Sequence, residues 1–124
     1  MQPDLFAGTP SARVYSVSEI NERVRRLLEE AFGEVEVEGE ISNARPQSSG
    51  HWYFTPKDAN SQLLCVLFRS DAATLRFTLE NGLRVRAPGR IGLYSPQGKY
   101  QLQVRSLRPV GQGALELAFR QLKE

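Results

Sequence analysis

The sequence of 124 residues has only one cysteine and one histidine. A single cysteine cannot form a disulfide within the chain and is typical of a reducing compartment, so we expect a cytoplasmic location. With so few Cys and His residues, no zinc-ligand spacing occurs, and we predict no metal site and no cofactor. No apolar run approaches the roughly 18 residues that suggest a membrane span. The first residues also lack the basic start and long apolar core of a signal peptide.

The net charge is small, but it is unevenly distributed along the chain. The formal net charge is +2. Residues 1–40 carry nine acidic against four basic side chains, whereas residues 41–108 carry ten basic against three acidic ones. Such a basic segment suits a polyanionic partner such as a nucleic acid. A solvated surface of mixed charge explains the same distribution, because composition does not show where the bases lie in space.

The first regular element is predicted to be an amphipathic helix over residues 17–32. Ser16 and Glu19 have the spacing of a capping box, and Gly33 is placed to end the helix. Apolar residues recur between them at helical spacing: Ile20, Val24, Leu27, Leu28 and Ala31. We expect residues 1–13, which precede this helix, to form a flexible tail.

The next segment switches to the period of a strand. In residues 34–41, glutamates alternate with Val35, Val37, Gly39 and Ile41. This alternation indicates a half-buried strand with its glutamates facing outward, and Gly39 suggests a bend or bulge. The glutamates could in principle hold a divalent ion, but a solvated or arginine-paired face is the better interpretation. A polar loop is expected over residues 42–50.

Four more strands are expected, over residues 51–57, 62–69, 84–93 and 99–107. A short helix over residues 72–78 separates the third strand from the fourth, and Ser-Pro-Gln-Gly at 95–98 indicates a hairpin. Five short strands with Gly and Pro turns predict a sandwich or small barrel. The position of the short helix favours a mostly β, five-stranded OB-fold barrel over residues 14–110. Residues 111–124 are predicted to begin another helix.

Three strings in the sequence resemble the N-terminal OB-fold domain of the exodeoxyribonuclease VII large subunit. They are Val-Glu-Gly-Glu-Ile-Ser-Asn at 37–43, Ser-Gly-His-Trp-Tyr-Phe-Thr at 49–55, and Leu93-Tyr94 with Gly-Lys-Tyr-Gln at 98–101. The resemblance covers about residues 14–124 in order. One departure is Pro56, where the family pattern has leucine. Because proline lacks a ladder donor, we expect the second strand to end or bulge there.

The resemblance implies a bacterial large subunit in which this OB domain precedes a nuclease domain and a long helical segment. Residues 111–124 would then begin the helix that leads to the absent nuclease domain. The resemblance also implies assembly with several small helical subunits and degradation of single-stranded DNA from either end. The chain has no Gly-rich phosphate loop and no Gly-x-Ser-x-Gly elbow. We therefore predict no catalytic residue here and expect the domain to bind and present single-stranded DNA.

The aromatic second strand supplies the main binding candidates. Trp52 and Phe54 are expected to face the core, because they are the larger and less polar pair. His51, Tyr53 and Lys57 would then lie outside, with Arg45 in the loop before them. In OB-fold binders an aromatic platform stacks bases and basic loops follow the backbone. Alternatively, Tyr53 packs under the N-terminal helix, and His51 is an ordinary surface residue.

Further candidates lie on the later strands. Gln62 is expected to lie beside Tyr53 and meet a base edge, or to be a plain solvated strand start. Arg69, at the end of the third strand, is a candidate for a phosphate contact, as is Lys99 in the hairpin. Tyr100 is expected to continue the core face of its strand.

The fourth strand carries three arginines of matching parity, Arg84, Arg86 and Arg90. They form either a track for a nucleic-acid backbone or a set of partners for the glutamates of the first strand. Two other functions stay open besides single-stranded DNA binding. One is a docking or dimerisation module that uses the helix over residues 17–32, and the other is an anticodon-type RNA-binding OB domain.

Overall fold

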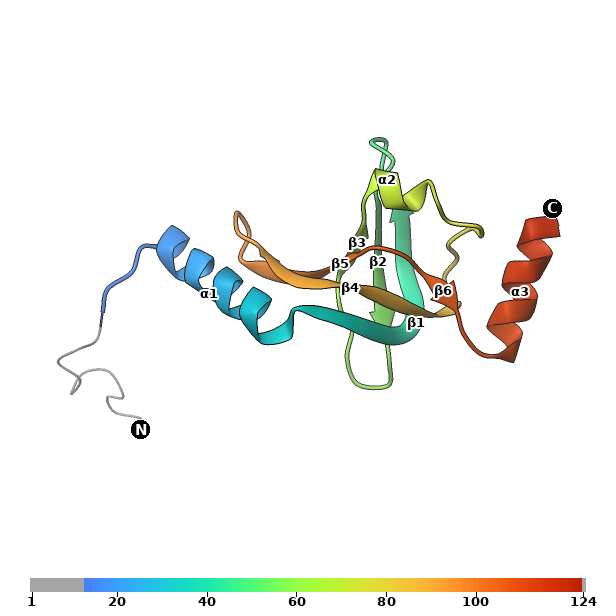
Figure 1. The fold of residues 1–124 in the computed structure, drawn as a ribbon, viewed down its shortest axis with the longest axis horizontal. Helices are drawn as coiled ribbons and strands as arrows, with labels where there is room; N and C mark the ends of the chain where they lie inside the picture. Colours follow the sequence, from blue (N-terminus) through green and yellow to red (C-terminus); the bar gives the residue numbers. More distant parts are fainter. Residues whose placement is uncertain (1–12, 124) are drawn as a thin grey trace.

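The computed structural model describes residues 13–123, except for several side chains of the last helix. The predicted tail therefore lies outside the described residues, apart from Arg13. Figure 1 shows a small β-barrel with one helix projecting at each end. Its elements, in chain order, are α1 Val17–Phe32, β1 Glu34–Pro46, β2 Trp52–Lys57, β3 Cys65–Leu67, α2 Arg69–Ala72, β4 Arg84–Tyr94, β5 Lys99–Val104, β6 Arg108–Pro109 and α3 Gln112–Lys123.

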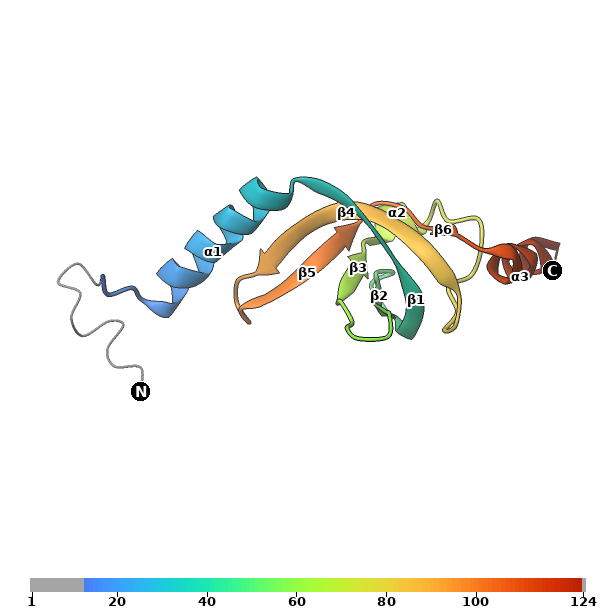
Figure 2. The same ribbon diagram turned by 90° about the horizontal axis from the view of Figure 1, so that it is seen from below.

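The strands close into a barrel because β1 has two partners. The order is β1-β2-β3-β5-β4, and the first half of β1 pairs with β4 while its second half pairs with β2. Strand β1 crosses close to β2 at Gly39, where an added Cβ atom on the glycine would lie 3.0 Å from the Pro56 Cβ. Figure 2 shows β1 passing across β4. The predicted five-stranded OB-fold barrel is confirmed, with the short β6 added beside β4.

The core forms where the inward faces of these strands meet. Phe54, Leu67 and Leu102 are fully buried there, and Trp52 is half-buried and packs against this cluster. The predicted inward orientation of Trp52 and Phe54 is therefore correct. Cys65 also lies in the core, and burial raises the pKa of its thiol to about 12. Because the thiolate is the reactive form, this cysteine is not a candidate nucleophile.

The predicted N-terminal helix is confirmed with its bounds. Ser16 and Glu19 form both hydrogen bonds of the capping box, at 2.8 and 3.0 Å, and Gly33 ends the helix. The helix does not cover the barrel, because none of its residues is buried. It lies beside the hairpin that joins β4 to β5, where Asn21 Nδ2 donates to the carbonyl of Ser95 at 3.1 Å.

Two predicted boundaries were wrong. The expected loop at 42–50 is largely strand, because β1 continues to Pro46 through a bulge between Ser42 and Arg45. The short helix begins at Arg69 rather than at residue 72, and the third strand is correspondingly short. The helix starts early because the Arg69 N–H donates to His51 Nδ1 at 2.8 Å, which satisfies a donor that the first turn leaves unpaired.

Pro56 does not end or bulge the second strand, contrary to expectation. It pairs directly with Ile41 inside the β1–β2 ladder. The backbone groups of Ile41 are already used, because its N–H donates to Leu83 and its carbonyl accepts from Gly82. The Ile41–Pro56 pair therefore needs no donor from Pro56, and the ring is accommodated without loss of a ladder bond.

The last helix, α3, confirms the helix predicted near the end of the chain. The Gln121 side chain accepts a 2.9 Å hydrogen bond from the Thr78 N–H, which fastens α3 to the segment before β4. The helix lies at the opposite end of the molecule from α1 (Figure 1). Within residues 13–123, no helix is long and apolar enough to cross a membrane.

Candidate nucleic-acid interface

Four side chains form a row across the outer wall of the barrel. Tyr53 on β2 pairs with Arg45 on β1 and with Val66 on β3, and Val66 pairs with Gln103 on β5. Directly paired residues point to the same face of a sheet, so the four share the outer surface. We call Arg45, Tyr53, Val66 and Gln103 the platform row. Arg45 lies in β1 itself, not in a loop before β2 as predicted.

The members of the platform row combine aromatic, apolar and polar chemistry. Val66 is only 1% exposed although it faces outward, whereas Tyr53 is half-buried and the two end residues are exposed. An aromatic ring on such a wall can stack a nucleobase, and a guanidinium can bind a phosphate. The amide of Gln103 can donate to or accept from a base edge. Tyr53 does not lie under α1, which packs against β4.

Arg69 lies beyond Val66 along the strand direction, and its neighbours hold it beside Gly50. A Cβ atom on Gly50 would lie 2.7 Å from Arg69 Cγ, so the arginine stem lies directly over this glycine. Gly50 has a φ of 95°, which a side chain would also disfavour. His51 accepts the Arg69 N–H through Nδ1, and its ring meets Phe68 edge-on at 5.3 Å between centroids. His51 thus positions Arg69, and whether it also contacts a ligand stays a prediction.

Lys57 and Gln62 lie at the other end of β2, away from Tyr53. The two residues pair in an isolated bridge, and Lys57 Nζ lies 4.0 Å from Glu40 Oε2. The expectation that Gln62 lies beside Tyr53 was wrong, because four residues of strand correspond to ~13 Å. The turn after β2 explains this placement. Asp58 Oδ1 accepts from the N–H groups of Asn60 and Ser61, which lowers the pKa of Asp58 and returns Gln62 beside Lys57. The contacts with nucleic acid that the sequence predicts for Lys57 and Gln62 stay predictions.

The β4–β5 hairpin extends past the barrel and carries Lys99. Lys99 pairs with Tyr94 close to the tip of the hairpin, and the Lys99 side chain is exposed. Tyr100 was expected in the core but is 56% exposed. It has the parity of the buried Leu102, yet the hairpin projects beyond the barrel at this point, so that face is no longer covered. Lys99 stays a predicted contact that lies away from the platform row.

The glutamates of β1 are paired with arginines. Glu38 accepts from Arg84 Nε and Arg86 Nε, each at 2.8 Å, and the other pairs are Arg105–Glu34 at 2.8 Å and Arg108–Glu36 at 3.2 Å. Of the two interpretations of the β4 arginines, ion pairing is thus confirmed for Arg84 and Arg86. Within the described part of the chain, no cluster of three or more His, Cys, Asp or Glu side chains could hold a metal ion.

Arg90 differs from the other two β4 arginines. Its pairing partner on β5 is Gln103, so it extends the platform row onto β4. Among the residues that the structure describes, Arg45, Arg69 and Arg90 have no ion pair with a carboxylate. Arg45 and Arg90 thus lie beside the row without a carboxylate partner, although Arg90 also stands opposite Glu34 in the β1–β4 ladder. Arg84, Arg86, Arg105 and Arg108 neutralise the glutamates of β1.

Replacing Glu38 with glutamine is expected to remove a pH-dependent part of the stability. Hydrogen bonds from Arg86 and Arg84 lower the pKa of Glu38 below its ordinary 4.5. The stabilisation is therefore complete above the unfolded pKa and is lost as the pH falls through the lower folded value. In thermal melts, the wild type should unfold at a higher temperature than Glu38→Gln near pH 7. The difference should be small, because the pair is exposed, and should shrink as the pH is lowered through the depressed pKa of Glu38. A difference that does not change with pH contradicts this assignment.

Sequence reasoning missed Val66 and Gln103 as members of the row, and Arg90 as its extension onto β4. The third strand is apolar throughout, so its alternation gives no sign that Val66 points outward. Gln101 and Gln103 do alternate with the buried Leu102 and Val104, and this signal was visible. What the sequence could not show is that β5 lies beside β3, which brings Gln103 next to Val66.

Comparisons with known proteins agree with this architecture. Residues 15–108 match the family model described as an OB-fold nucleic acid binding domain. The chain is 52% identical to the exodeoxyribonuclease 7 large subunit of Sulfurimonas denitrificans, over 87% of this chain and 26% of that protein. It is also 52% identical to that of Stutzerimonas stutzeri, over 90% of this chain and 24% of that protein. The chain thus spans about a quarter of the length of these relatives.

A solved structure with a similar fold is a replication protein A heterotrimer bound to single-stranded DNA. The alignment has a TM-score of 0.52 and 19% identity, and it covers 73% of this chain and 67% of that one. At this level of identity the similarity concerns the fold of the barrel.

Proposed function

Because the chain belongs to the family of OB-fold nucleic acid binding domains, we propose that it binds single-stranded DNA across the platform row. The observation that carries this proposal is the position of Tyr53 between Arg45 and Val66, on a wall whose arginines are not paired with carboxylates. The identity of about half of the residues to exodeoxyribonuclease large subunits supports DNA as the ligand.

The chemistry of the row favours single strands over duplexes. A base can lie flat on Tyr53 only when its face is not covered by its neighbours in a stacked helix. Arg45 lies directly beside that position, and Arg69 lies further along the wall beside Gly50, so both can meet phosphates of a strand whose base stacks on Tyr53. The four residues of the row span three spacings between strands, and Arg90 adds a fourth. The length is therefore about 14–19 Å, which suits a few nucleotides. We therefore expect micromolar or weaker affinity.

We propose further that the complete protein is an exodeoxyribonuclease and that this domain presents the single strand to a nuclease domain elsewhere in it. The length of the relatives, about four times that of this chain, supports this division. Association with small helical subunits is proposed to occur through those other parts. The cytoplasmic location inferred from the single cysteine stays a prediction.

Titration of a fluorescently labelled oligo-dT with the chain, followed by anisotropy, tests the binding proposal. If Arg45, Arg69 and Arg90 each contact one phosphate, the association constant should fall roughly 20-fold between about 50 and 200 mM salt. A duplex of equal length should bind more weakly, because its base faces are covered. RNA of the same length serves as the second comparison. Preference for the duplex, tighter binding of RNA, or binding that ignores salt contradicts the proposal.

A further inference from the structure

Helix α1 leaves an apolar stripe uncovered. Val17, Ile20, Val24 and Leu27 are exposed to 76%, 40%, 37% and 58%, and Ala31 continues the line. An amphipathic helix ordinarily buries such a stripe, and an uncovered one of this size marks an interaction surface. We call these five residues the seam. It lies on α1, outside the platform row, so its function is separate from the proposed DNA binding.

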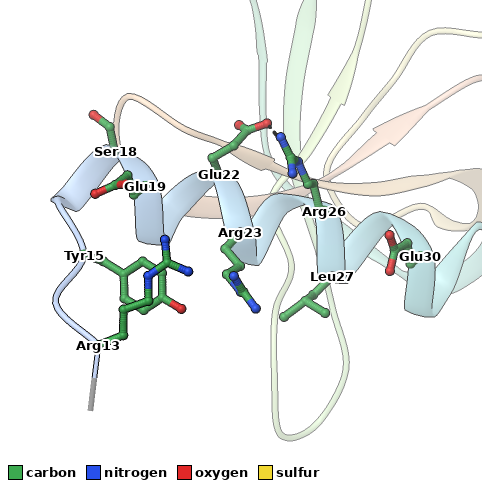
Figure 3. Close-up of a pocket in the computed structure, with 9 residues that line it drawn as sticks. All are labelled: Arg13, Tyr15, Ser18, Glu19, Glu22, Arg23, Arg26, Leu27 and Glu30. Atoms are coloured by element: carbon green, nitrogen blue, oxygen red, sulfur yellow. Dashed lines mark ion pairs between the residues drawn. The ribbon is translucent and has the colours of Figure 1, made fainter. Parts of the chain in front are cut away.

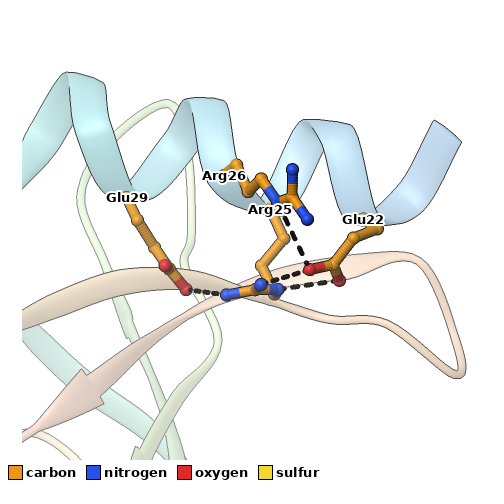
Figure 4. A network of polar contacts seen from close by, with 4 residues as sticks. All are labelled: Glu22, Arg25, Arg26 and Glu29. Atoms are coloured by element: carbon orange, nitrogen blue, oxygen red, sulfur yellow. Dashed lines mark hydrogen bonds and ion pairs between the residues drawn. The ribbon is translucent and has the colours of Figure 1, made fainter. Parts of the chain in front are cut away.

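The side of α1 that meets the barrel is not the seam. Asn21 bonds the hairpin there, and Leu28 packs against the core cluster. Arg25 forms ion pairs with Glu22 and with Glu29, the latter at 2.7 Å (Figure 4). These pairs lower the pKa of Glu22 and raise that of Arg25. The polar side is thus satisfied within the chain, whereas the seam has no partner among residues 13–123.

The spacing within the seam is that of a coiled coil. Its residues follow each other by three, four, three and four positions, which places Val17, Val24 and Ala31 at heptad position a. Ile20 and Leu27 occupy position d. Arg23 and Glu30 are both at position g, so they flank the same edge of the seam. Figure 3 shows Arg23, Leu27 and Glu30 along this side of the helix.

We propose that α1 packs antiparallel against α1 of a second copy of this chain. In the register that sets Val24 opposite Leu27 of the second copy, Ile20 meets its Ala31. The two g positions then face each other, and Arg23 meets Glu30 of the second copy. A two-fold axis forms this pair twice. In a parallel pair, Arg23 would instead face an e position, which holds Asn21 or Leu28 in this helix.

The flanking charges are available for this pairing. Within residues 13–123, neither Arg23 nor Glu30 makes an ion pair, although the Arg23 guanidinium lies 5.8 Å from the Tyr15 ring centroid.

A groove of about 400 Å³ continues the apolar surface from α1, with Leu28, Phe32 and Tyr100 in its lining. A seam of two such helices is smaller than the ~800 Å² per partner of a standard interface, so a reversible dimer is expected.

Charge reversal of the flanking residues tests the dimer and its direction together. Arg23→Glu and Glu30→Arg each replace two attractive pairs by two repulsive ones, so each should raise the dimer dissociation constant about tenfold or more at low salt. An equimolar mixture of the two variants restores opposite charges at both positions and should regain the dimer. Sedimentation velocity over a range of concentrations measures the dimer in each variant and in their mixture.

The control is Arg26→Glu, which makes the same charge change outside the seam and removes only the 3.7 Å pair of Arg26 with Glu22 within α1. It should leave the dimer unchanged, and circular dichroism should show equal helicity for every variant. A wild-type chain that stays monomeric at all concentrations overturns the proposal. So does a mixture of the two reversed variants that is no heavier than its components.

Discussion

Replacing Tyr53 with alanine is expected to weaken binding of single-stranded DNA roughly 5- to 150-fold, which corresponds to about 1–3 kcal/mol. The ring is the only aromatic group in the platform row, and Tyr53 lies between Arg45 on β1 and Val66 on β3. Without it a base has no flat surface to stack on. The phosphate contacts of the arginines would survive, so weak, salt-dependent binding should remain.

Two control variants separate stacking from general damage. Tyr53→Phe keeps the ring and should bind nearly as well as the wild type. Tyr94→Ala removes an exposed aromatic side chain from the hairpin, away from the row, and should have little effect. Because Tyr53 is half-buried, the melting temperature of each variant should be measured beside its anisotropy curve. Wild-type affinity in a folded Tyr53→Ala variant contradicts the stacking role.

Replacing Gly89 with alanine is expected to destabilise the barrel by about 3 kcal/mol or more. A Cβ atom at this position would clash with the carbonyl oxygen of Gln103 and would lie 3.0 Å from the Val104 Cα. Both are backbone atoms of β5, so no side chain can move aside. The ladder between β4 and β5 must open, and the backbone of Gln103 shifts with it. This loss is a large fraction of the stability of a small domain.

Gly92→Ala is the matched control, because it lies in the same strand and is also buried. The nearest atom to its added Cβ would be Gln103 Nε2 at 3.6 Å, an ordinary contact. Urea unfolding should therefore show a much lower midpoint for Gly89→Ala and a small change for Gly92→Ala. Equal midpoints for the two variants contradict the close approach of β4 and β5 at Gly89.

Local sequence patterns predicted the elements that depend on residues close together in the chain. The capping box of Ser16 and Glu19 located α1, and the alternation of residues 34–41 located the glutamate face. Neither pattern shows what the element packs against. Helical spacing indicates an apolar face on α1, but the structure leaves that face outside the barrel.

The binding face was harder to predict because it depends on the register between strands. Tyr53 was found from its parity, but its neighbours on the wall come from β1, β3 and β5. Gln62 was placed beside Tyr53 because it opens the third strand. The tight turn stabilised by Asp58 instead returns it to Lys57. Sequence spacing alone does not distinguish these registers.

The most direct test of the proposed interface is the change in backbone amide chemical shifts when oligo-dT is added to the isotope-labelled chain. We predict that the largest changes occur at Arg45, Tyr53, Val66 and Gln103, with Arg69 at the edge. Glu38 and its paired arginines, Arg84 and Arg86, in the β1–β4 ladder should change little. Largest shifts on the glutamate face, or along the seam of α1, would contradict the assignment of the platform row as the DNA-binding surface.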